Sequence, residues 1–339
     1  MDRSRRIAVI GTGTWGIALA RMLAVNGHDV AAWSAIPAEI ERLKTTHTHQ
    51  NLPGVEFPES IYFTTDMEEA CKDRDVLVFA VPSVFVRSTA EKAAPFIPDG
   101  QIIVDVAKGI EPDTLMTMTE IIEDVMKKMR PEISVRLVAL SGPTHAEEVA
   151  RDMVTTIVSA SKDSEAAHIV QEIFSNSVMR VYTNSDVKGV EICGAMKNIM
   201  ALASGVAMGM GYGDNMKAAI MTRGLAEITR LGRAMGCDER TFAGLAGIGD
   251  LIVTATSVHS RNNRCGNLIG QGKSVKEAIE EVGMVVEGIN AVPAAMELSK
   301  KYNVELPITE AVSRVVFNDE SPSQLLQSLM DRTFTDEIY

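Results

Sequence analysis

The sequence predicts an α/β fold, in which a Rossmann-like, doubly wound parallel sheet is followed by an all-α C-terminal domain. Three observations predict it. Short apolar segments rich in β-branched residues alternate with helix-like segments through the first half of the chain. A glycine-rich turn joins the first of these segments to the first helix-like one, and the strand-like segments stop after about Thr183. Repeated strand–helix–strand units indicate a parallel sheet because parallel strands need a crossover, which is usually a helix.

Seven segments are expected to be strands. They are residues 6–11 (RIAVIG), 29–33 (DVAAW), 76–81 (VLVFAV), 101–107 (QIIVDVA), 135–142 (VRLVALSG), 155–160 (TTIVSA) and 179–183 (MRVYT). Helices are expected between them at residues 14–27, 83–97 and 114–129. Alternation of this kind predicts strands that are covered by helices.

Two long helices are expected to open the second half, at residues 186–209 and 214–236. Asp214 is the expected N-cap of the second helix and Gly236 its expected C-terminal glycine. Pro293 argues against one continuous helix over residues 287–302, because proline removes a backbone donor. At 339 residues the chain is long enough for two domains. We therefore expect a Rossmann-like domain at residues 1–185 and an all-helical domain at residues 186–339.

The composition excludes several classes of partner. The formal net charge of −12 argues against a nucleic-acid or anionic-membrane surface, so positive groups for an anionic substrate must be local. No apolar run is long enough to span a membrane, and the N-terminus has no signal-like apolar core. The four cysteines are scattered without a paired motif, as in a reduced intracellular protein. These features predict a cytoplasmic protein without nucleic-acid partners or membrane insertion.

The turn after the first strand has the spacing Gly11-x-Gly13-x-x-Gly16, which is the dinucleotide-binding fingerprint. The first glycine permits a tight turn, the second lets backbone N–H groups approach a pyrophosphate, and the third lets the helix pack close to the strand. Thr14 and Trp15 occupy the loop positions against the pyrophosphate. The loop therefore predicts a nicotinamide dinucleotide site.

The choice between NAD and NADP is open at this stage. An acidic residue after the second strand binds a ribose 2′-hydroxyl, whereas a basic residue there holds a 2′-phosphate. The residues that follow this strand, Ser34, Ala35 and Ile36, carry no charge. Ala35 is nevertheless expected to lie against the cofactor.

Five later segments, in this order and spacing, closely resemble NAD(P)-dependent glycerol-3-phosphate dehydrogenase of the bacterial type. They are AKGIE (107–111), SGPTHAEEVA (141–150), GAMKNIMALASG (194–205), GLAGIGDLIVTATSVHSRNNRCG (244–266) and VVEG (285–288). The likeness runs from Ile7 to about Thr309. It implies reversible NAD(P)H-dependent reduction of dihydroxyacetone phosphate to sn-glycerol 3-phosphate, the backbone precursor of phospholipids. It also implies a cytoplasmic homodimer without a metal.

Ketone reduction needs a hydride donor, a proton donor and positive charge beside the developing alkoxide. Lys197 is the candidate general acid, because its apolar neighbours in sequence would desolvate the ammonium and lower its pKa. By resemblance, Asp250 orients this lysine and Thr254 lies nearby. Lys108 follows a strand at the edge where such sheets bind ligands. The resemblance gives it contact with the substrate and cofactor and a part in stabilising charge at the carbonyl oxygen.

The substrate phosphate is assigned to the segment HSRNNR. Arg261 offers a planar fork and Asn262 a neutral donor, and Ser260 is also a plausible helix cap. The resemblance assigns all three to the substrate and places Arg261 near the cofactor as well. It further assigns substrate or nicotinamide contacts to Gly142, Thr144, Ala146, Val285 and Glu287. His145 and Arg264 receive no role.

Two other functions fit part of this pattern. One is a β-hydroxyacid or 6-phosphogluconate-type dehydrogenase, which also combines a Rossmann domain, a helical domain and a catalytic lysine. The other is a non-catalytic NAD(P)-binding sensor. The block GLAGIGDL…SRNNR argues against the first, and the presence of Lys108, Lys197, Asp250 and Arg261 together argues against the second.

Overall fold

A computed structural model describes residues 4–333 and 336–337. The chain divides into two compact units, each described here by itself. The sheet unit comprises Met1–Gly194 and Arg240–Asp250, and the helical unit comprises Ala195–Glu239 and Leu251–Tyr339. A short stretch that follows two long helices thus belongs with the sheet, which the sequence pattern did not indicate.

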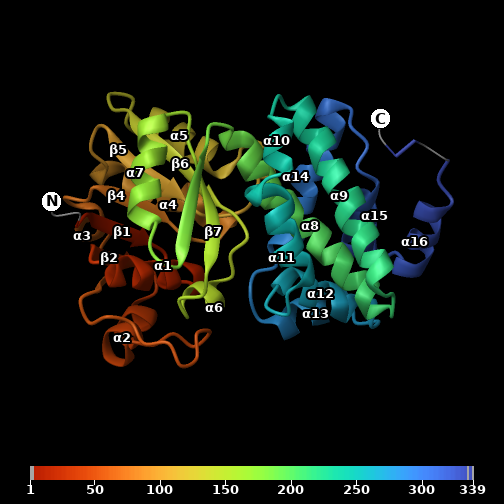
Figure 1. Ribbon diagram of the computed structural model, residues 1–339, viewed down its shortest axis with the longest axis horizontal. Helices are drawn as coiled ribbons and strands as arrows, with labels where there is room; N and C mark the ends of the chain where they lie inside the picture. Colours follow the sequence, from red (N-terminus) through yellow and green to blue (C-terminus); the bar gives the residue numbers. More distant parts are fainter. Residues whose placement is uncertain (1–3, 334–335, 338–339) are drawn as a thin grey trace. The chain divides into compact units, whose positions relative to one another are not determined.

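An eight-stranded sheet forms the centre of the sheet unit (Figure 1). Its order is β3-β2-β1-β4-β5-β6-β7-β8, and the pairs are parallel except for antiparallel β6 and β7. The strands are β1 (Arg6–Ile10), β2 (Asp29–Trp33), β3 (Tyr62–Thr64), β4 (Val76–Phe79), β5 (Gln101–Asp105), β6 (Val135–Ser141), β7 (Thr155–Ala160) and β8 (Met179–Asn184). All seven expected strands are present, and the three-residue β3 is an addition.

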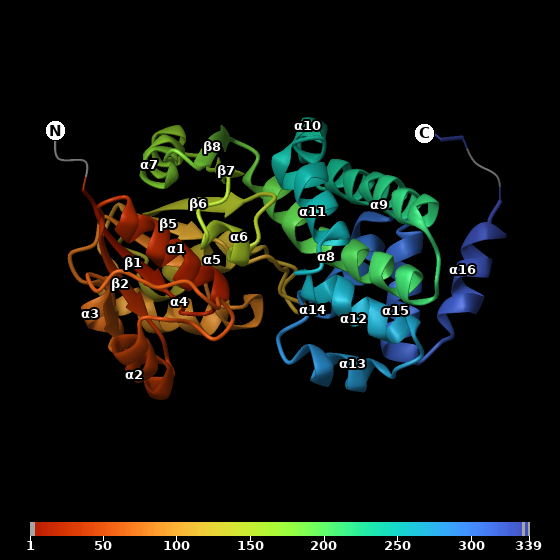
Figure 2. The same ribbon diagram turned by 60° about the horizontal axis from the view of Figure 1, so that its bottom comes forward.

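Helices cover both faces of this sheet (Figures 1 and 2). Ile7 and Val9 of β1 belong to the apolar cluster that includes α1 and α7, whereas Ala8 and Ile10 belong to the cluster that includes α4 and α5. This alternation buries both faces, as expected of a parallel sheet. The helices of the unit are α1 (Thr14–Val25), α2 (Pro37–Thr46), α3 (Met67–Cys71), α4 (Val86–Ala93), α5 (Met118–Met129), α6 (Ala146–Val149) and α7 (Ser164–Phe174).

The long helix α8 (Val187–Gly209) carries the chain from the sheet unit into the helical unit. The remaining helices are α9 (Asp214–Ala234), α10 (Glu239–Phe242), α11 (Asp250–Thr256), α12 (Arg261–Gly270), α13 (Val275–Val282), α14 (Glu287–Tyr302), α15 (Pro307–Asn318) and α16 (Pro322–Met330), with one turn of π-helix at Leu245–Gly249. Two expectations need correction. The N-cap of α9 is Gly213, with Asp214 its first residue, and α14 continues through Pro293.

Helices α8 and α12 approach until their backbones touch, at four glycines. A Cβ atom added at Gly205 or Gly209 of α8 would lie 2.1 Å from a peptide oxygen of α12. One added at Gly266 or Gly270 of α12 would lie 2.1 Å from a peptide oxygen of α8. Glycine is therefore required on both sides of this crossing. The two four-residue spacings resemble the small-residue motif of closely packed helices.

Helix α8 is also long and apolar enough to cross a membrane, but 83% of its apolar window is buried inside the protein. Among the described residues, the only further candidate is a bent pair formed by Glu239–Thr256 and Arg261–Gly270. Core helices of folded domains have the same properties.

Candidate active site

The loop between β1 and α1 has the geometry expected of a phosphate cradle. Gly11 has a φ of +121°, and a Cβ there would lie 2.8 Å from the carbonyl group of Ala80 on the neighbouring segment. A Cβ on Gly16 would lie 2.0 Å from the Gly11 oxygen, whereas the space beside Gly13 is open. Glycine is thus required where the chain packs against itself, and Gly13 leaves its backbone accessible.

The polar groups of this loop fit a dinucleotide. Gly13 is the N-cap of α1 and provides no side-chain cap, so the first N–H groups of the helix are left for an anion. The Thr12 hydroxyl is buried without a hydrogen-bond partner. Thr14 Oγ1 accepts a 3.0 Å hydrogen bond from Asn51 Nδ2, and Thr14 and Trp15 are both half-buried. An ordered loop with open N–H groups is what a bound pyrophosphate requires.

The surroundings of the end of β2 are more polar than the uncharged residues Ser34, Ala35 and Ile36 suggest. Ala35 is exposed, and it follows the buried Ser34. The hydroxyl of Ser34 donates a 2.8 Å hydrogen bond to Glu39 Oε2. The uncharged end of β2 therefore has a carboxylate beside it. Reasoning from the sequence missed Glu39 because it stands in the following helix, α2.

Lys108 and Asp250 meet within the sheet unit. Lys108, in the loop after β5, donates a 2.6 Å hydrogen bond to Asp250 Oδ2 and a 3.3 Å one to the Gly142 carbonyl oxygen. Asp250 is fully buried, and the Lys108 side chain is 18% exposed. The loops after β5 and β6 and the start of α11 thus supply one polar cluster. The contact between Lys108 and Asp250 is one that the sequence did not indicate, and the predicted orientation of Lys197 by Asp250 stays a prediction.

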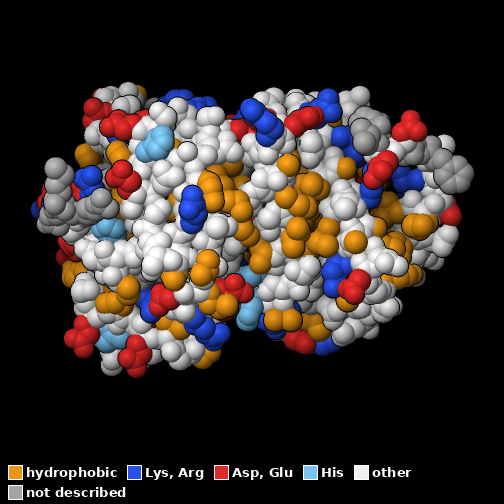
Figure 3. All heavy atoms as spheres, viewed as in Figure 1, with side chains coloured by type: hydrophobic (Ala, Val, Ile, Leu, Met, Phe, Trp, Pro, Cys, Tyr) orange, Lys and Arg blue, Asp and Glu red, His pale blue; other side chains and the backbone are white. Residues whose placement is uncertain are grey.

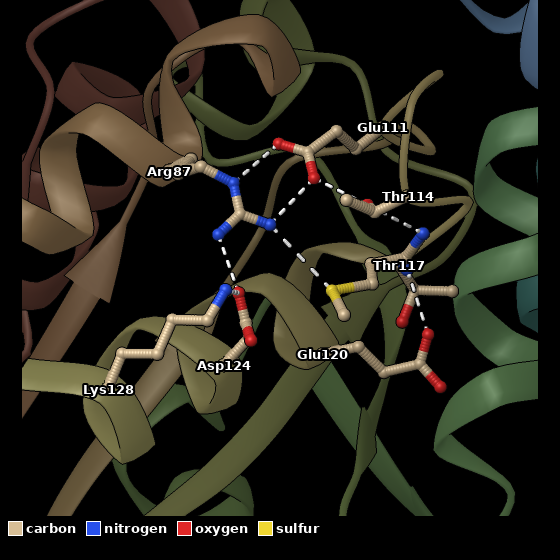
Figure 4. Close-up of polar contacts among 8 residues, drawn as sticks. Arg87, Glu111, Thr114, Thr117, Glu120, Asp124 and Lys128 are labelled. Carbon is tan, nitrogen blue, oxygen red and sulfur yellow. Dashed lines mark hydrogen bonds and ion pairs between the residues drawn. The ribbon is translucent and has the colours of Figure 1, made fainter.

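An arginine on α4 holds the loop that carries Lys108 (Figure 4). Arg87 Nε and Nη2 donate to the two oxygens of Glu111 at 2.7 and 2.6 Å, and Nη1 donates to Asp124 at 2.7 Å. These contacts lower the pKa values of both carboxyl groups, mainly through the hydrogen bonds from Arg87. A bidentate arginine fixes direction as well as distance, so the loop is held three residues beyond Lys108.

Two buried carboxyl groups lie behind the same loop. Glu191 of α8 accepts hydrogen bonds from the Thr117 hydroxyl (2.7 Å) and from the Thr119 N–H and hydroxyl groups (2.8 and 2.6 Å). Burial is the main cause of the raised pKa of Glu191 and of Asp105, the last residue of β5. Asp105 Oδ1 has no hydrogen-bond partner. Both groups therefore ionise less readily than an exposed carboxyl group does.

The loop after β6 brings together three predicted contact residues. A Cβ on Gly142 would lie 3.0 Å from the Cα of Ile157, so this strand end requires a small residue. The Thr144 hydroxyl donates to the Gly142 carbonyl oxygen at 3.2 Å, and Ala146 is the first residue of α6 after the N-cap His145. Thr144 and Ala146 are half-buried, which leaves part of each accessible.

In the helical unit, Lys197 lies in the interior of α8. Its side chain donates a 2.6 Å hydrogen bond to Thr254 Oγ1 on α11. Lys197 and Thr254 are each only 5% exposed. Burial of an ammonium group is costly, so its presence points to a function.

The start of α12 is fixed by side-chain amides. Asn262 Nδ2 donates to Asn198 Oδ1 (2.9 Å), and Asn262 Oδ1 accepts from the Gly288 N–H (2.8 Å). The Ser260 hydroxyl caps the helix by accepting from the Asn263 N–H at 3.2 Å. Arg261 is the first residue of the helix and is exposed. Asn262 thus serves first as a link between helices, a role the sequence did not suggest.

The two remaining predicted contacts lie at the start of α14. Val285 is half-buried in the segment before the helix, and Glu287 is its first residue and also half-buried. Asn290 Nδ2 donates to Glu287 Oε2 over a long 3.4 Å.

Comparisons with known proteins identify the family. Models of the N- and C-terminal parts of NAD-dependent glycerol-3-phosphate dehydrogenase match residues 6–167 and 186–327. The chain belongs to this family. It is 60% identical over 333 residues to glycerol-3-phosphate dehydrogenase [NAD(P)+] 2 of Lactobacillus delbrueckii subsp. bulgaricus, covering 98% of this chain and 99% of the relative. It is 49% identical to glycerol-3-phosphate dehydrogenase [NAD(P)+] of Bacillus subtilis, covering 98% and 96%.

A crystal structure of glycerol-3-phosphate dehydrogenase from Coxiella burnetii has the same fold as this member of the family. The TM-score is 0.91 at 33% identity, covering 97% of this chain and 100% of the other. The predicted fold class, family, oxidoreductase activity and NAD(P) dependence are confirmed. The glycerol-3-phosphate dehydrogenase function is confirmed over the alternative dehydrogenase and sensor functions. The roles of individual residues remain predictions.

Proposed function

We propose that the chain reduces dihydroxyacetone phosphate to sn-glycerol 3-phosphate, supplying the glycerol backbone for phospholipid synthesis. One observation carries the assignment of the chemistry to residues. Lys197 is buried in α8 and bonded to Thr254, as a proton-transferring lysine in an apolar setting would be. A bound nicotinamide cofactor supplies the hydride.

Lys197 is proposed to donate the proton to the carbonyl oxygen as it becomes an alkoxide, and to remove it in the reverse reaction. A buried ammonium group that is held in one position can act as a general acid toward a carbonyl oxygen. Thr254 Oγ1 accepts one of its three hydrogens, so this contact sets the direction in which the remaining two point.

Lys108 is proposed to stabilise negative charge at the carbonyl oxygen, with Asp250 as its positioning partner. The 2.6 Å contact with a fully buried carboxylate limits the rotamers of Lys108. Its second contact, with the Gly142 carbonyl oxygen, directs it toward the loop that carries Thr144 and Ala146. A preformed cation of this kind needs no reorganisation when charge develops.

Arg261 is proposed to bind the substrate phosphate, with Ser260 and Asn262 framing the start of α12. Arg261 is exposed and is the first residue of a helix whose N-terminal N–H groups favour anions. Its guanidinium matches phosphate oxygens in geometry and charge. In a chain with a net charge of −12, such local positive charge is needed to recruit an anionic substrate.

The proposal also covers the roles of the two domains, the oligomeric state and the cellular location. We infer that residues 1–185 bind the cofactor, that residues 186–339 contribute the helical catalytic domain, and that the enzyme is a cytoplasmic homodimer. An apolar groove formed by α8, α9, α15 and α16, with hydrophobic side chains over this unit in Figure 3, supports self-association. Sedimentation at micromolar concentration tests the dimer, and cell fractionation tests the location.

A spectrophotometric assay tests the reaction. Addition of dihydroxyacetone phosphate to enzyme and NAD(P)H is expected to cause rapid loss of cofactor absorbance. Turnover with a hydroxyacid but not with this substrate would refute the proposal.

A further inference from the structure

NAD and NADP differ by one phosphate on the adenosine ribose, and the fold places that ribose near the end of β2. β2 pairs in parallel with β1, with Trp33 opposite Ile10, and the Gly11 N–H donates a 2.8 Å hydrogen bond to the Trp33 oxygen. The residue after Trp33 therefore lies beside the glycine loop. That residue is Ser34, which is 6% exposed.

The hydroxyl of Ser34 both donates and accepts a hydrogen bond. It donates to Glu39 Oε2 at 2.8 Å and accepts from the Ile36 N–H at 3.2 Å. The Ser34 N–H in turn donates to the Thr64 oxygen at 3.2 Å, next to β3. The turn between β2 and α2 is thus ordered, and Glu39 is held by its first oxygen.

The second oxygen of Glu39 is available. Glu39 is half-buried in the first turn of α2, and Oε1 has no hydrogen-bond partner among the described residues. A carboxylate oxygen can accept a hydrogen bond from a hydroxyl group but repels a phosphate dianion. We propose that Glu39 is the specificity-determining residue of the cofactor site, and that the enzyme binds NAD(H) in preference to NADP(H).

Two nitrogen-containing side chains near Glu39 are alternative candidates, because either could bind a 2′-phosphate if it were charged. Arg42, one turn further along α2, donates through Nη1 to Gln50 Oε1 at 3.0 Å. His49 is 4% exposed, and burial lowers its pKa, which disfavours its charged form. Arg42 is therefore a cation near Glu39 that could receive a 2′-phosphate, with its Nη1 bound to Gln50 and its Nε buried without a hydrogen-bond partner.

The segment that carries these residues is anchored to the cofactor loop. Asn51 Nδ2 donates to Thr14 Oγ1 in the first turn of α1. The Phe57 N–H donates to the His47 oxygen, closing the segment into a compact loop. This loop and β2 are both tied to the glycine turn, so the segment that carries Glu39 is held at both ends beside that turn.

Equilibrium binding of NADH and NADPH to the full-length enzyme tests the proposal by titration calorimetry. Wild type is expected to bind NADH about tenfold or more tightly than NADPH, because like charges at a recognition site disfavour the wrong ligand. Glu39→Gln retains an acceptor for Ser34 and is expected to bring the ratio close to one, chiefly by tightening NADPH. Glu41→Gln, which removes an exposed charge from the same helix, should leave the ratio unchanged.

Three results would overturn the proposal. They are equal or tighter binding of NADPH by wild type, the same ratio in Glu39→Gln and Glu41→Gln, or a selective loss of NADPH affinity in Arg42→Gln. Thermal unfolding verifies that each variant is folded. The proposal rests on the proposed function only in requiring a nicotinamide cofactor. Preferential NADH binding without turnover of dihydroxyacetone phosphate would refute the reaction alone, whereas turnover with equal binding of both cofactors would refute the role of Glu39 alone.

Discussion

The ammonium nitrogen of Lys108 lies 2.6 Å from Oδ2 of Asp250, a carboxylate with no exposed surface. The two residues are separated by 142 positions in the sequence. Loss of one partner from a buried pair leaves an uncompensated charge, whereas joint loss does not. The two residues are therefore expected to act as one unit in folding.

Replacement of either partner alone should lower the free energy of unfolding by more than half of the loss that replacement of both partners causes. We expect Asp250→Asn to lower the free energy of unfolding by about 3 kcal/mol and Lys108→Met by a similar amount, with the double variant far from additive. Urea unfolding measures this. The exposed pair Lys300–Glu297 is the matched control and should show a coupling of about 0.5 kcal/mol. Additive effects at Lys108 and Asp250 would contradict a coupled buried pair.

Lys197→Ala should abolish turnover while NADH affinity stays within about twofold of wild type, because only the proton donor is removed. Steady-state kinetics and calorimetry measure the two effects. Lys217→Ala, on α9, is the control and should retain activity. Residual turnover above about a tenth of wild type would argue against Lys197 as the general acid.

Arg261→Ala should mainly raise the KM for dihydroxyacetone phosphate, by about a hundredfold, because a charge-assisted contact with the phosphate is lost. Arg264→Ala is the matched comparison, since this residue is exposed on the same helix. An equal rise in both variants would show that diffuse positive charge, and not Arg261 itself, recruits the phosphate.

Arg87→Lys should loosen the loop that carries Lys108, because lysine cannot reproduce the two-point contact with Glu111 shown in Figure 4. We expect a several-fold rise in KM for the substrate, faster proteolysis of the loop, and little change in NADH affinity. Arg136→Lys alters a comparable contact, with Asp163 and Glu165. Should it produce the same kinetic change, the effect of Arg87 would be on stability alone.

Glu227 predicts a pH-dependent stability. It accepts hydrogen bonds from the Ile308 and Thr309 N–H groups, yet burial raises its pKa from 4.5 to about 7. The folded state therefore holds this proton more tightly than the unfolded state does. Its stabilising contribution is complete below pH 4.5 and is lost as the pH rises to about 7, by up to about 1.4 kcal/mol per pH unit.

Unfolding midpoints in urea between pH 5 and 8 measure this loss. The stability of Glu227→Gln relative to wild type should increase with pH, whereas that of the exposed control Glu297→Gln should stay constant. A pH-independent difference for Glu227→Gln would show that its pKa is near 4.5 in the folded state.

Much of the fold could be predicted because its signals are local. Each expected strand is a short apolar segment, and the glycine spacing marks the first turn directly. The strand β3 was not predicted, because three residues are too few to show an alternation of apolar and polar side chains. The antiparallel pairing of β6 and β7 was not predicted because the short segment between them, with only the four-residue helix α6, carries no signal of strand direction.

The candidate site was predictable as a set of residues but not as a set of contacts. Lys108 and Asp250 were both named, yet their pairing depends on tertiary structure. Glu39 was missed because it stands five positions beyond Ser34, in a helix whose orientation the sequence does not determine. The links made by Asn262 were missed because an amide has no sequence signal that separates ligand contact from structural contact.

The glycine crossing between α8 and α12 has a mechanical consequence. Where peptide oxygens fill the volume of absent side chains, neither helix can slide or roll without a backbone collision. Lys197 and Arg261, one on each helix, are therefore expected to move together as parts of one rigid pair of helices. Any flexing during the catalytic cycle is left to the loops. Each of the four glycines is therefore needed on its own account, since a methyl group at one of them cannot be accommodated by a change at another.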